Sequence, residues 1–104
     1  MKITKVQGRK FDNENSNVKG IVEVTLDGCF VVKDIRIIQK PEKMVVAMPS
    51  KIVNGHNEDG SVNEDIRVHK DLAHPINHET RQMFDETILK AYNEAENSTF
   101  VVEL

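Results

Sequence analysis

The chain has 104 residues, which suits one small domain with one core and is too short for two. Its single cysteine, Cys29, excludes an intramolecular disulfide, and no apolar run is long enough to span a bilayer, so we expect one soluble, cytoplasmic domain over residues 1–104. The formal net charge of −3 by itself argues against a nucleic-acid binder.

The charges are distributed unevenly along the chain. Residues 1–53 hold ten Lys and Arg against six Asp and Glu, a net of +4, whereas residues 54–104 hold four against eleven, a net of −7. This layout allows a cationic face on a protein that is acidic overall. The plain alternative is that the strand surfaces use lysine and the helix surface uses glutamate, and charge alone does not decide between the two.

The first part of the chain predicts a pair of strands. Residues 2–11 mix apolar and basic side chains and predict a strand, and residues 12–17 predict a turn because their side chains compete for backbone hydrogen bonds. Residues 20–27 alternate most regularly and predict a half-buried antiparallel strand. The dipeptide Asp27-Gly28 then predicts a hairpin turn into the next strand.

The most apolar stretch follows, and it predicts strands over residues 30–38 and 44–48. The strand over 30–38 has apolar residues on both faces, so we expect a helix to cover one face and a second subunit to cover the other. Simple alternation places Asp34 and Arg36 on one face, where they could pair. We interpret such a pair as a contact between strands or subunits in preference to a catalytic carboxylate.

The second half predicts one helix. Residues 51–70 are polar and rich in turn signals, and predict either an extended loop or a short hairpin. Residues 77–96 predict a helix with Asn77 as its N-cap and an apolar stripe at helical spacing, and residues 99–102 predict a last short strand. The predicted fold is therefore α+β: an antiparallel sheet of four to five strands with one C-terminal helix packed on it.

No constellation of catalytic or metal-binding residues stands out. Four potential zinc ligands crowd together, but Pro75 interrupts the segment, so loop and capping roles are the more ordinary explanation for them. These four are His69, Asp71, His74 and His78. Cys29 has no identifiable activating base, and no phosphate-binding glycine loop is present. We expect no enzyme activity, no cofactor, no metal site and no small-molecule substrate.

Several ordered motifs nevertheless point to a known family. They are Thr25 to Asp27, Phe30 to Arg36, Val46 to Lys51, and Asp71 to Asn77 together with Thr80 and Arg81. In this order they closely resemble the bacterial stage V sporulation protein G (SpoVG) family, whose members are also called septation regulators. The resemblance covers most of residues 1–96.

The resemblance implies a homodimer formed through the strands, and a regulator that binds DNA, and in some members RNA, to affect septation, sporulation or virulence genes. The positions that the family associates with nucleic acid fall on Lys51, Lys70 and Arg81 of this chain. To these we add Lys33 and Arg36, from the basic strand, as further phosphate contacts.

The chain departs from the family pattern in three places. Ile52 stands where the family usually has a second basic residue, and the tail over residues 99–104 has no certain counterpart. The loop before Asp71 is also longer than usual and carries carboxylates that would repel phosphate, namely Glu58, Asp59, Glu64 and Asp65.

An alternative function is a regulator of cell division that docks a protein partner through an acidic helix face. That face would comprise Glu79, Asp85, Glu86 and Glu94.

Overall fold

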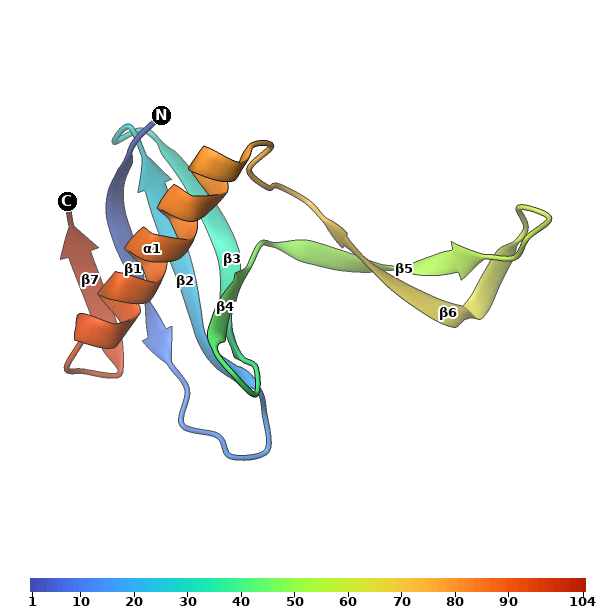
Figure 1. The fold of residues 1–104 in the computed structure, drawn as a ribbon, viewed down its shortest axis with the longest axis horizontal. Coiled ribbons are helices and arrows are strands. Elements are labelled where there is room, and N and C mark those ends of the chain that lie inside the picture. The colour runs from blue at the N-terminus through green and yellow to red at the C-terminus, as the bar shows by residue number, and fades with distance from the viewer.

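The computed structural model describes all residues from 1 to 104 and shows a body from which one long arm projects (Figure 1). The elements in chain order are β1 (Ile3–Lys10), β2 (Val18–Leu26), β3 (Phe30–Gln39), β4 (Met44–Ala47), β5 (Ser50–His56), β6 (Val62–Asp71), α1 (His78–Glu94) and β7 (Thr99–Glu103). The body is a five-stranded antiparallel sheet in the order β4-β3-β2-β1-β7, and the arm is the two-stranded sheet β5-β6. The predicted α+β class is confirmed.

The body agrees closely with the predicted elements, whereas the arm is a longer hairpin than predicted. Each predicted strand of the body and the predicted helix over 77–96 lies within two residues of its observed bounds. The segment 51–70, predicted as an extended loop or a short hairpin, is instead a long hairpin. Its ladder runs from the pair Ser50 and Asp71 to the pair His56 and Val62.

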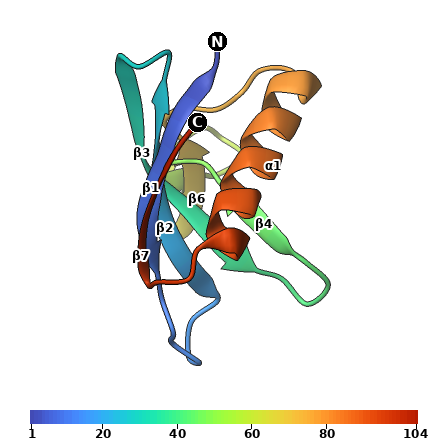
Figure 2. The ribbon, with the colours of Figure 1, turned by 90° about the vertical axis from the view of Figure 1, so that its left-hand side faces the viewer.

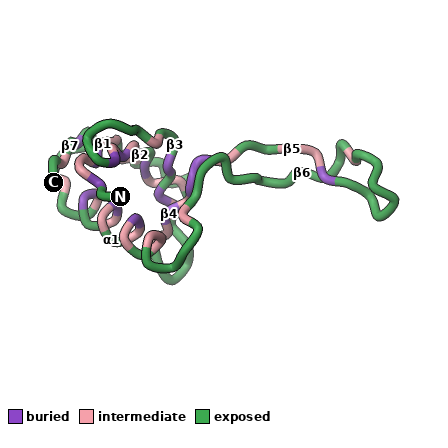
Figure 3. Tube along the Cα trace, turned by 90° about the horizontal axis from the view of Figure 1, so that it is seen from above, coloured by how far each residue is buried: buried purple, intermediate pink, exposed green.

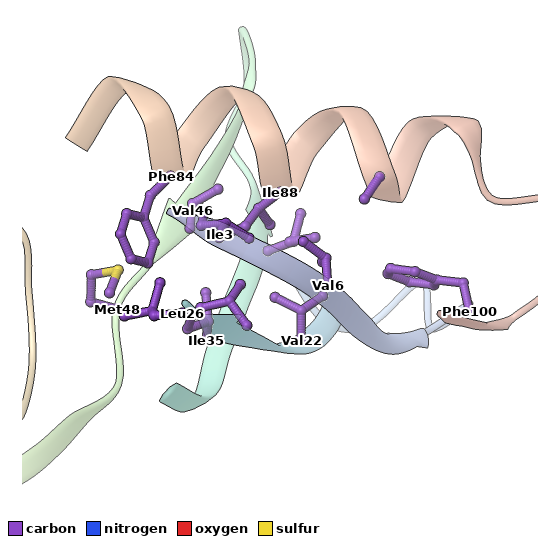
Figure 4. Close-up of a cluster of buried hydrophobic side chains, with 13 residues drawn as sticks. Ile3, Val6, Val22, Leu26, Ile35, Val46, Met48, Phe84, Ile88 and Phe100 are labelled. Carbon is purple, nitrogen blue, oxygen red and sulfur yellow. The ribbon is translucent and has the colours of Figure 1, made fainter. Parts of the chain in front are cut away.

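The core lies between the sheet and α1, which covers only one face of the sheet (Figure 2). Alternate residues of β2 point toward the helix, and Phe84 and Ile88 of α1 point back at them (Figure 4). Thirteen buried apolar side chains form one cluster: Ile3, Val6, Val22, Val24, Leu26, Ile35, Ile37, Val46, Met48, Phe84, Ile88, Ala91 and Phe100. The apolar residues at every second position of the strands and those at helical spacing in α1 therefore pack against each other at one interface.

The alternation in β3 is broken by a bulge. Two of its residues, Lys33 and Asp34, stand opposite a single residue of β2, and Asp34 has a φ of 61°. The bulge shifts the alternation, so Val32 before it and Ile35 after it both pack on the core. The simple two-face assignment from the sequence is therefore wrong, and the considered ion pair between Asp34 and Arg36 is not formed.

Polar contacts fix both ends of α1. At the N-terminus, the Asn77 side chain accepts a hydrogen bond from the Thr80 backbone N–H at 2.8 Å, as expected of an N-cap. At the C-terminus, the Lys10 ammonium of β1 donates to the Ala95 carbonyl at 2.7 Å and lies 4.8 Å from the centre of the Tyr92 ring. A cation at this end complements the helix dipole and ties the helix to the sheet.

Candidate nucleic-acid interface

The arm brings together two of the predicted nucleic-acid contacts. It extends away from the β4 side of the sheet (Figures 1 and 3), and Lys51 of β5 pairs directly with Lys70 of β6 near its root. Both side chains are exposed, and neither forms an ion pair with a carboxylate. Directly opposed residues of an antiparallel pair have Cβ atoms about 4.5–5.5 Å apart, and like charges at this distance repel each other. The root of the arm is therefore a concentrated positive charge.

Arg81 lies elsewhere and is already engaged. Its guanidinium donates a hydrogen bond to the Val46 carbonyl of β4, and its Nε lies 3.2 Å from Oδ1 of Asp85 one turn along the helix. The Arg81 side chain is 39% exposed to solvent. It therefore ties α1 to β4, the strand that leads into the arm, and keeps part of its surface for solvent.

Lys33 and Arg36 lie on another surface, the face of the sheet that α1 leaves open. Lys33 borders a shallow groove of about 390 Å³ on this face. Arg36 pairs with Ile21 of β2, whose side chain lines the same groove. The five predicted contacts thus occupy three places, and only Lys51 and Lys70 are brought together.

The hairpin also presents a cation that the sequence analysis missed. Arg67 of β6 is exposed and pairs directly with Asn54 of β5, three positions beyond Lys51 along the arm. A guanidinium and a carboxamide can each form two hydrogen bonds with a base edge in the major groove of DNA. Only the pairing of β5 with β6, which was not predicted at this length, could have drawn attention to this pair.

The far end of the arm has the opposite charge. Four carboxylates gather there: Glu58, Asp59, Glu64 and Asp65. The Ser61 hydroxyl and the Ser61 backbone N–H donate to Asp59 at 2.6 and 2.9 Å, and these bonds lower the pKa of Asp59 from its ordinary value of 3.8. The tip is therefore negatively charged at neutral pH, so a polyanion is favoured at the root of the arm and disfavoured at its end.

The four potential zinc ligands around Pro75 do not converge. His69 is on β6, His74 is in the following loop and His78 begins α1, and no three His, Cys, Asp or Glu side chains of the chain are placed to hold a metal ion. The one helix, α1, is neither long nor apolar enough to cross a membrane.

Comparison with known proteins gives a consistent result. The SpoVG family model matches residues 1–94, which include every element from β1 to α1 and leave β7 outside. A protein of Phytoplasma australiense named "Putative septation protein SpoVG" is 39% identical over 99 residues, which cover 94% of this chain and 90% of the relative. Proteins of the same name from Clostridioides difficile (strain 630) and Bdellovibrio bacteriovorus are 41% and 40% identical. They align over 91% and 88% of this chain and over 90% and 73% of their own lengths.

Proposed function

We propose, since the chain belongs to the SpoVG family, that it is a bacterial regulatory protein that binds DNA as a homodimer, and so modulates gene expression, septation or sporulation. The root of the arm is the main binding surface, and RNA is a second candidate ligand. The relatives are named for septation, which supports the cellular role.

The cross-strand pair of Lys51 and Lys70 carries this proposal. Two like charges directly opposite each other destabilise a ladder, and no carboxylate of the chain neutralises them. A phosphate backbone supplies the missing negative charge, and the counterions it releases on binding add to the affinity. The arm projects from the body, so a duplex can approach it from outside the body (Figure 1).

The other predicted cations take lesser roles in the proposal. The exposed part of Arg81 contributes a further phosphate contact, while its bond to the Val46 carbonyl positions α1 beside the strand that leads into the arm. Lys33 and Arg36 lie on the open face of the sheet and contribute through long-range attraction of the polyanion. A second copy would double the lysine pair, and two linked contacts bind more tightly than one because the second is intramolecular.

The test is binding of fluorescent duplex DNA and single-stranded RNA, measured by anisotropy across a range of salt concentrations. Changing both Lys51 and Lys70 to alanine should weaken binding to duplex DNA and reduce the slope of log affinity against log salt by about 0.9 per lysine. The matched control changes Lys40 and Lys43, two lysines that face each other at the β3–β4 turn, where the Lys40 N–H donates to the Lys43 carbonyl at 2.8 Å. The proposal fails if the wild type binds neither nucleic acid at low salt, or if both double variants bind equally well.

Exposed groups beside the start of α1 favour protein docking as the second candidate. Leu72 and Ile76 expose 63% and 88% of their surfaces, and Ile76 is the most exposed large apolar side chain of the chain. The acidic residues Glu79, Glu86 and Glu94 are also exposed, whereas Asp85 is turned toward Arg81. A partner captured after nuclease treatment, and lost when Ile76 is changed to serine, would favour this function over nucleic-acid binding.

A further inference from the structure

The arm has two faces that carry different side chains. Its first five residue pairs, counted from the body, follow one another without a register shift, so the side chains alternate strictly between the two faces. Lys51 and Lys70 lie on one face, which we call the lysine face. The other face, which we call the second face, carries Ile52 with His69, Asn54 with Arg67 and, at the end next to the body, Ser50 with Asp71.

The polar groups at the centre of the second face have no partner within the chain. At the tip of the arm, by contrast, the Asn57 amide donates to the Ser61 hydroxyl at 3.0 Å. The side chains of Arg67 and Asn54 form neither a hydrogen bond nor an ion pair. Ile52, on the same face, is 55% exposed. The second face therefore offers free hydrogen-bonding groups beside an exposed apolar side chain.

These side chains match the chemistry of base edges. A guanidinium forms two hydrogen bonds with guanine, a carboxamide forms two with adenine, and an apolar side chain contacts the thymine methyl group. Directly opposed residues such as Asn54 and Arg67 have Cβ atoms about 4.5–5.5 Å apart. Ile52 precedes Asn54 by two residues, about 6.6 Å along the strand, which is close to two base-pair steps of about 3.4 Å. The spacing of the three side chains therefore suits neighbouring bases of one duplex.

We infer that the second face of the arm lies in the major groove of duplex DNA and reads its sequence, with Arg67 on a guanine, Asn54 on a neighbouring adenine and Ile52 on a thymine methyl group. The inference deepens the proposed function and rests on it, because it assigns sequence specificity to a chain proposed to bind DNA. The major groove is about 12 Å wide and admits a two-stranded β-ribbon.

The lysine face keeps its role in this arrangement. Lys51 lies three positions from Asn54, about 10 Å along the strand, so the lysine pair lies toward the edge of the groove. Lys51 and Lys70 belong to different strands, and each long, flexible side chain reaches the phosphates on its own side of the groove. The lysines thus supply affinity for any sequence, while the second face supplies the preference for one sequence.

Negative charges border the second face at both ends. Asp71, its one carboxylate, lies next to the body. At the other end the register shifts directly after Asn54, and β6 changes direction near the acidic tip (Figure 1). A bulge bends a strand in this way, so the tip leaves the line of the second face. These carboxylates disfavour any pose in which the duplex lies over the body end or the tip, and leave the centre of the face for the bases.

A change of base preference tests the inference. Wild-type protein selects duplexes from a random pool, and anisotropy then compares the selected sequence with singly substituted duplexes. We expect a selected motif with a guanine beside an adenine. Arg67→Gln should shift the preferred base at the guanine position to adenine, because glutamine pairs with adenine, and should lower the preference for guanine about tenfold. The matched control Lys70→Gln removes the same charge, and should weaken binding to all sequences while leaving the preference unchanged.

Modified bases locate the contact. Replacing the selected guanine by 7-deazaguanine removes one acceptor from its major-groove edge, and should weaken binding of the wild type about fivefold but leave Arg67→Gln unaffected. If the selected pool shows no preferred base, or if Arg67→Gln keeps the wild-type preference, the inference is wrong and DNA binding through the lysine pair stands. If the wild type binds no duplex at low salt, the proposed function and the inference both fail.

Discussion

The body and the arm are built on opposite principles. The body buries thirteen apolar side chains in one cluster, whereas the only buried residue of the arm is Gly55. Most of the arm is exposed (Figure 3), and four of its five large apolar side chains, Ile52, Val62, Ile66 and Val68, remain 39–60% exposed. An isolated two-stranded hairpin is marginally stable in water. The buried core of the body therefore stabilises the fold, while the arm presents charged side chains at some distance from that core.

The largest expected effect belongs to the core of the body. Ile35 of β3 is fully buried, so Ile35→Ala should lower the free energy of unfolding by about 2–5 kcal/mol, measured by urea denaturation. Ile52→Ala on the arm is the matched control, because Ile52 is 55% exposed and its loss should change stability by no more than about 0.5 kcal/mol. Equal losses in both variants would mean that the arm belongs to the cooperative core.

The next largest effect is a loss of stability that should be confined to the arm. A Cβ atom added at Gly55 would lie 2.2 Å from Cγ2 and 2.8 Å from Cβ of Ile66, so Gly55→Ala should overpack this point by about 1–3 kcal/mol. Hydrogen exchange should accelerate in β5 and β6 and stay unchanged in β1 and β2. Adding Ile66→Ala should restore part of the protection, because it removes the Cγ2 contact at 2.2 Å but keeps the Cβ contact at 2.8 Å. Faster exchange throughout the body would contradict the independence of the two regions.

A pH-dependent effect at alkaline pH should appear in the body. Burial raises the pKa of Tyr92 above its ordinary value of 10.0, and the Tyr92 hydroxyl donates to the Lys19 carbonyl at 3.2 Å. The folded state therefore retains a proton that the unfolded state loses. This contribution to stability is complete below about pH 10 and declines as the pH rises through the higher folded pKa. Denaturation between pH 8 and 11 should show a steeper decline for the wild type than for Tyr92→Phe, and parallel curves would refute this role.

The smallest effect should separate stability from function in the arm. Lys51→Glu replaces a like-charged cross-strand pair with an oppositely charged one, which should stabilise the arm by about 0.2–1 kcal/mol at low salt. The same change should abolish binding to duplex DNA, because it places a carboxylate at the proposed phosphate site. Hydrogen exchange and anisotropy on one sample measure both quantities. Slower exchange together with retained binding would move the binding surface away from the root of the arm.

The contrast between the two regions also explains what the sequence could predict. In β2 and α1, burial on one side imposes a period on the apolar residues, so the elements and the core could be predicted from the pattern. The arm has solvent on both faces, so burial imposes no period on β5 and β6. Turn signals at Asn54-Gly55 and Asp59-Gly60 then left both an extended loop and a short hairpin open. In the structure, only Gly60 of these two glycines has a positive φ, 89°, whereas Gly55 lies inside β5, where it makes room for Ile66.

The candidate site was predictable only in part, for a related reason. The resemblance to a family indicated Lys51 and Lys70, but their direct opposition depends on a register that no short motif specifies. The bond from Arg81 to the Val46 carbonyl joins a helix to a distant strand, and the pairing of Arg67 with Asn54 depends on the same hairpin. The bulge at Asp34 reversed the expected alternation, and no glycine at this position indicates the bulge in the sequence.

The ladder between β1 and β7 has a consequence for how the chain is made. Lys5 pairs with Glu103, so the two strands are separated by almost the whole sequence described here. During synthesis β1 can pair with β2 soon after both have emerged from the ribosome, but its other side stays unpaired until β7 follows. Nascent chains on neighbouring ribosomes would therefore expose the same unpaired strand at the same stage. We expect a chaperone that binds extended apolar segments to lower aggregation most in this interval.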